Sequence, residues 1–255
     1  MDVSDHLAAP DEHLDPSIAA NYERSVADRF SPETVAATVE FLAALAGDGP
    51  VVEFAVGTGR IALPLAATGV PVFGIDFSEP MLAELQRKPG ADRVALTVGD
   101  MTTARVCSDA SLVYLVFNTI GNLRTQRQQV ACFRNAAAHL RPGGRFVIEN
   151  GTPQIHRLPA GESILAVDVS PQHLGFDEYA DRVNQILISH HSFVEGGKVR
   201  VLSGAFRYVW PSELDLMAEL AGMTLEARWS TWRRDPYSAD SPSHVSVWRK
   251  GKHGG

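Results

Sequence analysis

The sequence predicts an α/β protein: a doubly wound sheet of seven strands, with a helical lid at its N-terminus and an antiparallel β insertion after the fifth strand. Three features of the 255 residues predict this fold class. Short apolar runs alternate with amphipathic segments from position 51 to position 149, a glycine-rich turn follows the first run, and longer runs rich in β-branched residues follow Asn150. A chain of this length can bury the core of one such domain with a modest insertion.

Two helices are expected ahead of the sheet. The first covers residues 18–30, and Ser31 and Pro32 supply an N-cap and a first-turn proline for a second helix that ends at Gly47. The leader before them is acidic and has few apolar anchors. We therefore expect residues 1–47 to form a helical lid.

Five parallel strands form the expected core. They are separated by segments with helical periodicity, and Thr125 with Gln128 marks the start of the last of these helices as a capping box. The expected strands are 51–55, 71–75, 93–98, 112–117 and 145–149. The core domain is thus expected at residues 48–150.

Beyond residue 150 the chain is expected to add an antiparallel cap and then return to the core. Runs rich in β-branched and apolar residues flank Gly196-Gly197, which indicates a hairpin. The candidate strands of this cap are 163–169, 181–194 and 198–209. We expect the cap at residues 151–210, followed by a helix and two closing strands of the core sheet at residues 211–255.

The composition argues against several classes of protein. The chain has 30 acidic residues against 23 Lys and Arg, which does not suit a nucleic-acid-binding surface. Its two cysteines, Cys107 and Cys132, form neither a CxxC pair nor a disulfide framework, as suits a reducing compartment. The sequence has no leader with a basic and an apolar region and no apolar run of membrane length. We expect a cytoplasmic monomer or homodimer without a nucleic-acid or membrane partner.

The turn after the first strand has the composition of an anion-binding loop. Residues 53–60 read EFAVGTGR, and Ala62 completes the pattern G-x-G-x-x-A. Glycines let a ligand approach the backbone at a helix N-terminus, where free N–H groups attract an anion. A tight turn without a ligand is the alternative for this pattern.

Glu53 narrows the choice of ligand. A carboxylate near the end of a central parallel strand is costly to bury without a partner, so a cationic group is expected within reach. A dinucleotide offers no suitable cation there, whereas S-adenosylmethionine carries an ammonium group on its methionyl half. The alternative is an ion pair between Glu53 and Arg60.

Two further acids follow the next strands. Asp76 stands at the end of the second strand, where an acid accepts hydrogen bonds from ribose hydroxyls. Helix capping is another role for Asp76, but Ser78 is the better placed cap. Asp100 and Met101 follow the third strand and offer a carboxylate for an adenine amino group and an apolar side chain for the ring.

Five segments, in this order, resemble the motif series of class I S-adenosylmethionine-dependent methyltransferases, which have a Rossmann-like fold. These segments are 53–59 (EFAVGTG), 74–81 (GIDFSEPM), 98–101 (VGDM), 117–119 (FNT) and 140–144 (LRPGG). Ala55 departs from the pattern, because the family usually has the first glycine of its loop there. A methyl group is small enough to be tolerated at this position.

Within this family the chain looks most like bacterial enzymes that methylate small molecules, including amino-sugar N-methyltransferases and natural-product tailoring enzymes. The resemblance implies that Tyr22, on an N-terminal lid, closes over the sulfonium end of the cofactor; packing of Tyr22 against Phe30 is the alternative. It also implies a set of cofactor-binding residues: Tyr22, Glu53, Ala55, Gly57, Thr58, Gly59, Arg60, Asp76, Phe77, Met81, Asp100, Met101, Phe117 and Asn118.

The histidines show no spacing typical of a metal site, so no metal is expected. His190 and His191 lie together in an expected cap strand and are candidates for a general base, with ordinary hydrogen-bonded strand histidines as the alternative. Adjacent strand residues point to opposite faces, so one of them at most faces the substrate. We favour His191, because Ile186 and Ile188 share the parity of His190 and place it on an apolar face.

The function expected from these features is methyl transfer from S-adenosylmethionine to a nitrogen or oxygen of a small molecule, in secondary metabolism, with Tyr22 and His191 as the candidate catalytic residues. Two alternatives share parts of the pattern. An NAD-dependent dehydrogenase would use the glycine loop and Asp76 but leaves Glu53 unexplained. A non-catalytic cofactor-binding module would bind the same ligand without turnover.

Overall fold

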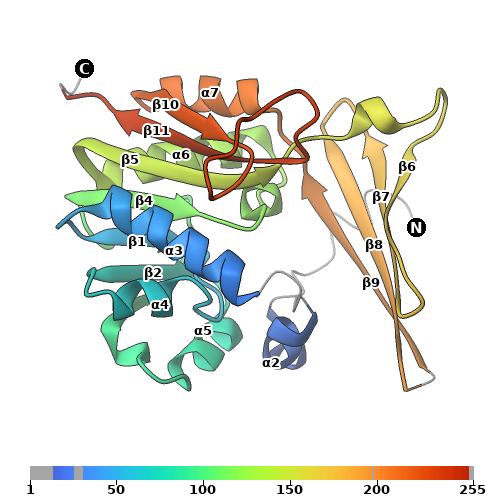
Figure 1. The fold of residues 1–255 in the computed structure, drawn as a ribbon, viewed down its shortest axis with the longest axis horizontal. Helices are drawn as coiled ribbons and strands as arrows, with labels where there is room; N and C mark the ends of the chain where they lie inside the picture. The colour runs from blue at the N-terminus through green and yellow to red at the C-terminus, as the bar shows by residue number, and fades with distance from the viewer. Residues whose placement is uncertain (1–13, 26–30, 197, 253–255) are drawn as a thin grey trace.

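The structure is a computed structural model that describes residues 14–25, 31–196 and 198–252. A seven-stranded sheet with helices on both faces forms the core, and a four-stranded antiparallel sheet stands beyond the ends of its strands (Figure 1). This arrangement confirms the expected fold class. None of the described helices is long and apolar enough to cross a membrane.

The core sheet has the spatial order β10-β11-β5-β4-β1-β2-β3. Its strands are β1 (Val51–Phe54), β2 (Val72–Asp76), β3 (Val94–Val98), β4 (Ala110–Leu115), β5 (Leu140–Gly151), β10 (Met223–Trp229) and β11 (Ser243–Lys250). Strands β1 to β5 pair in parallel, and β11 is antiparallel to both of its neighbours. The chain crosses from β3 to β4 beside β1, so the strand order reverses between β1 and β4. In such sheets, ligands bind at the carboxyl ends of the strands where the order reverses.

The helices begin where the sequence supplies caps. They are α2 (Pro16–Ser25), α3 (Pro32–Ala46), α4 (Ala62–Ala67), α5 (Glu79–Gln86), α6 (Gln126–His139) and α7 (Pro211–Leu220), with single 3-10 turns η3 (Ala91–Arg93), η4 (Thr119–Asn122) and η5 (Ile155–Arg157). Ser31 and Ser78 accept hydrogen bonds from the backbone N–H groups three residues ahead, and Thr125 forms the expected capping box with Gln128. The part of the first expected helix at 26–30 lies outside the described residues.

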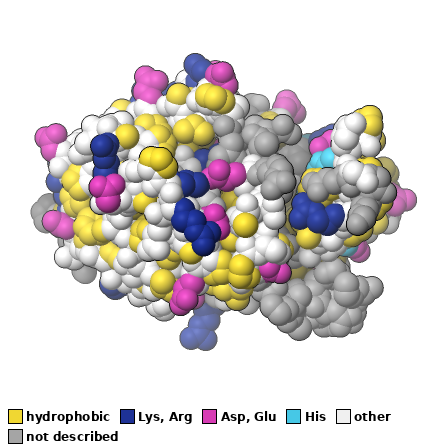
Figure 2. Space-filling model, turned by 90° about the horizontal axis from the view of Figure 1, so that it is seen from below, with side chains coloured by type: hydrophobic (Ala, Val, Ile, Leu, Met, Phe, Trp, Pro, Cys, Tyr) yellow, Lys and Arg dark blue, Asp and Glu magenta, His cyan; other side chains and the backbone are white. Residues whose placement is uncertain are grey.

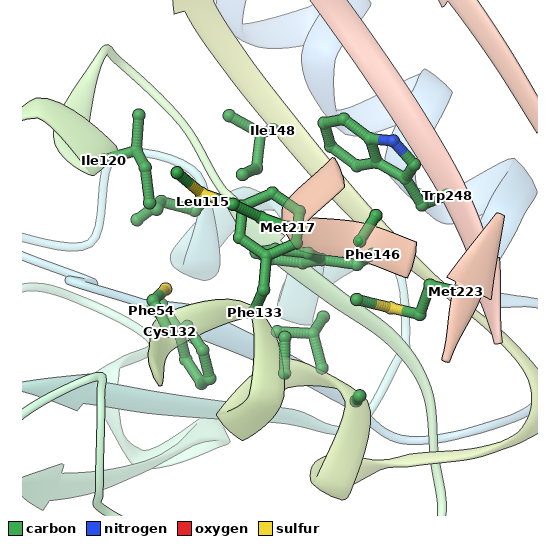
Figure 3. Packing of buried hydrophobic residues seen from close by; sticks show 14 of the residues in the cluster. Phe54, Leu115, Ile120, Cys132, Phe133, Phe146, Ile148, Met217, Met223 and Trp248 are labelled. Carbon is green, nitrogen blue, oxygen red and sulfur yellow. The ribbon is translucent and has the colours of Figure 1, made fainter. Parts of the chain in front are cut away.

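Two apolar clusters fix the helices against the sheet. Helices α6 and α7 pack on one face, where Phe133 lies 5.3 Å from Trp248 and 5.1 Å from Phe146 between ring centroids (Figure 3). Helices α3, α4 and α5 pack on the other face, around the buried side chains of Leu42, Leu65 and Leu85. The doubly wound arrangement follows from these two layers, since each face of a parallel sheet must be covered.

The insertion contains four strands, one more than expected: β6 (Ile164–Val169), β7 (His173–Asp181), β8 (Ile186–Glu195) and β9 (Lys198–Arg207). The predicted strand 181–194 was wrong at its start, because the chain turns between Asp181 and Ile186. Asp181 Oδ1 accepts hydrogen bonds from the backbone N–H groups of Val183 and Asn184, and Gln185 takes a φ of 60°. A turn without glycine or proline gave no strong signal in the sequence.

A buried ion pair holds the root of the insertion on the core. The Arg207 guanidinium donates to Glu213 at the start of α7 across 2.7 Å, to Gln185 across 2.7 Å, and also to Gln129 of α6. Because Arg207 is buried, removing either charge would leave the other unpaired inside the protein. The insertion is therefore anchored at the carboxyl edge of the sheet, where β5 leads into it (Figure 1).

Candidate functional site

The loop after β1 takes three left-handed backbone conformations. Ala55, Gly57 and Gly59 have φ values of 52°, 54° and 82°. A Cβ on Gly59 would lie 2.7 Å from Cγ of Leu85, so this position needs glycine for packing against α5 as well as for its φ. Ala55 occupies its left-handed position with a side chain, which stores backbone strain in the loop.

Glu53 is buried at the carboxyl end of β1 and accepts a hydrogen bond from a phenol. The Tyr114 O–H donates to Oε2 of Glu53 across 2.7 Å from the neighbouring strand β4. Burial raises the pKa of Glu53 to about 8, against the opposing effects of the Tyr114 hydrogen bond and the Arg60 charge. Without a ligand, the carboxyl is therefore largely protonated at neutral pH.

Arg60 lies at the end of the same loop. Its guanidinium carbon stands 4.8 Å from the centroid of the Phe117 ring, a cation–π distance. The positive charge of Arg60 lowers the pKa of Glu53, but less than the Tyr114 hydrogen bond does. The partner expected for Glu53 is thus supplied in part by a neutral side chain that the sequence did not indicate.

Asp76, at the end of β2, ties the glycine loop to the start of α5. Its Oδ2 accepts from the Gly57 N–H across 2.7 Å, and its Oδ1 accepts from the Ser78 N–H across 2.9 Å. These two bonds fix the backbone of the glycine loop relative to the start of α5. The negative charge of Asp76 raises the pKa of Glu53, so the two acids act on each other at the same edge of the sheet.

The other residues expected to contact a cofactor surround this edge. Phe77 is 41% exposed directly after Asp76, whereas Met81 is buried beneath the glycine loop, 3.7 Å from the place of a Cβ on Gly57. The strand ends lie side by side, because the Gly99 N–H donates to the carbonyl of Asp76 across 2.8 Å.

The segment after β3 is shaped by hydrogen bonds to Asp100 and Met101. Oδ1 of Asp100 accepts from the Thr102 N–H across 2.7 Å. The carbonyl of Met101 accepts from the Asn135 side chain across 2.8 Å, and the Met101 side chain packs against the core. Because Asp76 pairs with Val98 at the end of β3, Asp100 and Met101 follow at the same carboxyl edge as Asp76.

Phe117 and Asn118, after β4, form a consecutive left-handed pair with φ values of 67° and 60°. The Phe117 N–H donates to Oε2 of Glu149 across 2.9 Å, and the Gly151 N–H donates to Oδ1 of Asn118 across 2.6 Å. Oε1 of Glu149 accepts from the Trp232 indole across 2.9 Å. The sequence did not indicate Glu149 or Trp232, because their contacts depend on strand order and on a distant loop.

Helix α2 reaches the glycine loop through Glu23. Oε1 of Glu23 accepts from the Thr58 hydroxyl across 3.0 Å and also from the Lys88 ammonium, which donates to the Thr58 carbonyl across 2.6 Å. Tyr22 is half-buried on the same helix. Phe30, the alternative partner for Tyr22, lies outside the described residues.

The two adjacent histidines of β8 lie on opposite faces of the insertion. His190 Nδ1 is 2.9 Å from Oγ of Ser203, on the face where Ile186 and Ile188 are buried. His191 Nδ1 is 2.9 Å from Nε2 of His173. Its Nε2 is 3.1 Å from Oγ of Ser189, so both ring nitrogens of His191 are engaged.

The described residues offer neither a metal-ligating cluster nor, on the face drawn in Figure 2, a patch of one charge. In the described part of the chain, no group of three or more His, Cys, Asp and Glu side chains is placed to hold a metal ion. On the face drawn in Figure 2, Lys and Arg are interspersed with Asp and Glu rather than gathered into one patch.

Comparison with known proteins identifies the family. Residues 51–144 match the family described as methyltransferase domain. The CcbJ methyltransferase from Streptomyces caelestis is 36% identical in a superposition that covers 92% of this chain and 96% of that one, with a TM-score of 0.81. The chain belongs to the S-adenosylmethionine-dependent methyltransferases, and the dehydrogenase alternative is set aside.

Two more relatives are similar at lower identity. The cypemycin N-terminal methyltransferase of a Streptomyces species is 26% identical over 201 residues, which are 77% of this chain and 81% of that protein. The structure of CalS10 with bound S-adenosylmethionine, an amino pentose methyltransferase from Micromonospora echinaspora, superposes with a TM-score of 0.66 at 22% identity, covering 90% of this chain and 96% of that one. The similarity to CalS10 is a similarity of fold.

Proposed function

We propose that this enzyme transfers the methyl group of S-adenosylmethionine to an amine nitrogen of a small natural product and releases S-adenosylhomocysteine. The observation that carries the proposal is the pair of acids at the carboxyl ends of β1 and β2. Glu53 is a buried carboxyl with a raised pKa, and Asp76 lies at the end of the neighbouring strand, where its negative charge raises that pKa further. S-adenosylmethionine joins an amino acid to a ribose, so its ammonium group suits Glu53 and its ribose hydroxyls suit Asp76.

Each expected cofactor contact then has a chemical role. The ammonium of the methionyl half pairs with Glu53, and its carboxylate meets the N–H groups of the glycine loop at 55–60. The ribose hydroxyls donate to Asp76, while Asp100 and Met101 meet the adenine amino group and ring. Phe77 and Met81 flank the nucleoside, and Phe117, Asn118 and Tyr22 lie toward the sulfonium.

The chemical step needs alignment more than activation. The acceptor lone pair forms a bond to the methyl carbon as the carbon–sulfur bond breaks, and the electron pair of that bond remains on sulfur. The sulfonium is already an activated leaving group, so the protein must hold nucleophile, carbon and sulfur in line and exclude water. The methylated ammonium product then loses its proton to solvent or to a base.

A nitrogen acceptor suits this arrangement better than an alcohol. An amine that arrives neutral needs no base, whereas an alcohol must lose a proton as it attacks. Both ring nitrogens of His191 already make hydrogen bonds. For an amine that arrives as an ammonium, His191 is our candidate base, with proton movement through His173 toward Asp168, whose Oδ2 is 2.7 Å from Nδ1 of His173. The name of the cypemycin relative also supports a nitrogen acceptor.

We further propose that α2 closes over the bound cofactor as a lid through the Glu23 contacts, and that the enzyme works in the cytoplasm as a monomer or homodimer. Its two cysteines, Cys107 and Cys132, are both free thiols, which suits a reducing compartment. The acceptor is a small molecule rather than a nucleic acid, in keeping with the net negative charge of the chain.

A panel of matched acceptors tests the proposal. The enzyme is incubated with S-adenosylmethionine and with amino sugars, peptides that have a free N-terminus and the corresponding alcohols, and products are identified by mass spectrometry. We expect methylation of one amine class and equal amounts of S-adenosylhomocysteine. Methylation of the alcohols with the amines untouched would contradict the nitrogen assignment.

A further inference from the structure

We propose that Glu149 is a positioning residue for methyl transfer, which holds the Phe117–Asn118 turn against the cofactor site. The inference rests on the proposed function for the location of that site. Glu149 lies near the carboxyl end of β5, next to β4 in the sheet, and its carboxylate is half-buried. Its side-chain contacts run to the turn after β4 on one side and to the loop between β10 and β11 on the other.

The turn needs an external constraint. Phe117 and Asn118 both take left-handed conformations. Asparagine tolerates this region, but a bulky side chain such as that of Phe117 adopts it only at a cost, and such strain persists only where the surroundings fix it. The glycine that usually relieves this cost is absent from both positions. A strained phenylalanine directly after a central strand therefore indicates that the position of the turn matters for function.

Strand β5 supplies the constraint through three hydrogen bonds. The Glu149 carboxylate accepts from the Phe117 N–H across 2.9 Å, and the Glu149 carbonyl accepts from the Asn118 N–H across 3.2 Å. The third bond, from the Gly151 N–H to the Asn118 side chain, closes the turn from the other end. Only the first of these depends on the Glu149 side chain, so that contact can be changed by substitution.

The turn adjoins the glycine loop. The Phe117 ring lies under the Arg60 guanidinium at 4.8 Å, and Arg60 ends the loop that begins at Glu53. A displacement of the Phe117 backbone would therefore move a side chain that packs against the cofactor loop. Catalysis by alignment is sensitive to such displacements even when ligand binding is preserved.

Trp232 holds the other oxygen of the Glu149 carboxylate. Its indole N–H donates to Oε1 of Glu149 across 2.9 Å, while its ring packs edge-on against Phe41 of α3 at 5.3 Å. Both groups that contact the Glu149 oxygens are thus donors. A glutamine at this position would satisfy one donor with its oxygen and would present its NH2 group to the other.

This geometry separates two possible roles of Glu149. If the carboxylate positions the turn, Glu149→Gln is harmful because of the conflict between two donors, and Trp232→Phe removes that conflict. In the double variant the amide oxygen is free to accept from Phe117 and the NH2 group faces an apolar ring. If instead the negative charge itself is needed, the second substitution restores nothing.

The test compares wild type, Glu149→Gln, Trp232→Phe and the double variant. We expect Glu149→Gln to lower kcat by about tenfold or more, the cost of losing one hydrogen bond to a charged group, while the Kd for S-adenosylhomocysteine stays within about threefold. Amide hydrogen exchange across residues 117–121 should accelerate in Glu149→Gln. In the double variant, both kcat and exchange should return close to the values of Trp232→Phe.

Three results would overturn the inference: wild-type kcat in Glu149→Gln, unchanged exchange at residues 117–121, or a double variant as slow as Glu149→Gln. The exchange measurement needs no acceptor, so it decides the inference even if no amine proves to be a substrate. If Glu149→Gln does not fold, Trp232→Phe is compared with the double variant. Equal kcat values for these two variants support the positioning role, and a kcat about tenfold lower in the double variant contradicts it.

Discussion

The Tyr114 phenol donates to the Glu53 carboxyl across 2.7 Å between two neighbouring parallel strands, and both side chains are buried. The phenol is a neutral donor, so it gives the Glu53 carboxyl a hydrogen bond but no positive charge to balance its ionised form. Burial raises the pKa of Glu53 to about 8 and keeps the carboxyl largely protonated without a ligand, although the Tyr114 hydrogen bond and the Arg60 charge both lower that pKa. We expect this site to bind an ammonium group rather than a second anion.

Glu53 makes the stability of the ligand-free enzyme depend on pH. Its pKa rises from 4.5 in the unfolded chain to about 8 in the folded one, so its stabilising contribution is fully present below pH 4.5 and is lost as pH rises through 8. The loss is about 5 kcal/mol at most. Urea unfolding across this range should show that Glu53→Gln lacks this part of the pH dependence. Parallel stability profiles for the two proteins would refute the raised pKa.

Tyr114→Phe serves as a second probe of the same pair. It removes the hydrogen bond that lowers the pKa of Glu53, so the loss of stability should extend to higher pH than in wild type. A shift toward lower pH would contradict the arrangement.

The glycine loop should respond in opposite directions to two small substitutions. Ala55→Gly relieves a left-handed alanine at the cost of a more flexible unfolded chain, so its effect should lie between zero and a gain of about 1 kcal/mol. Gly59→Ala adds both a strained φ and a Cβ only 2.7 Å from Leu85, so it should destabilise by more than about 2 kcal/mol. Chemical denaturation measures both. A destabilised Ala55→Gly protein would show that the alanine methyl group contributes packing.

The proposed lid depends on one acid in α2. Binding of S-adenosylhomocysteine should slow hydrogen exchange across residues 16–25 in wild type, and Glu23→Gln should weaken this protection, because Glu23 joins α2 to Thr58 and Lys88. Glu40→Gln, which changes an exposed carboxylate of α3, is the matched control and should behave as wild type. Exchange at α2 that does not respond to the ligand would refute the lid.

The two histidines of β8 should differ in their effect on turnover. His191→Gln should lower kcat and remove an acidic limb of the pH–rate profile, whereas His190→Gln should leave both unchanged, since the side chains lie on opposite faces. Cofactor affinity should stay the same in both variants. If both keep the kcat and pH profile of wild type, neither histidine is the base, and alignment alone must account for the rate.

Sequence patterns predicted the parts of this structure that depend on local chemistry. The parallel strands follow from short apolar runs, and the helix starts follow from Ser31, Ser78 and Thr125, whose caps need only the next three residues. The candidate acids Glu53 and Asp76 could be placed at one edge because strands that pair in parallel end together.

The residues that were missed depend on long-range pairing. Tyr114 meets Glu53 because β4 lies beside β1, and Trp232 meets Glu149 from a loop 83 positions further along the chain. Neither relationship has a local signature. Strand β7 was missed for a different reason, since its turn at Asp181 is made by side-chain hydrogen bonds in a sequence without glycine.

Proton release on cofactor binding tests the central claim most directly. Calorimetric titration of wild type with S-adenosylhomocysteine, in buffers of different ionisation enthalpy at neutral pH, counts the protons exchanged. If the ligand ammonium pairs with an ionised Glu53, whose pKa is about 8 without the ligand, close to one proton should leave the protein for each ligand bound, and Glu53→Gln should release none. Binding of similar strength with no proton released by wild type, or with the same release from Glu53→Gln, would contradict the account.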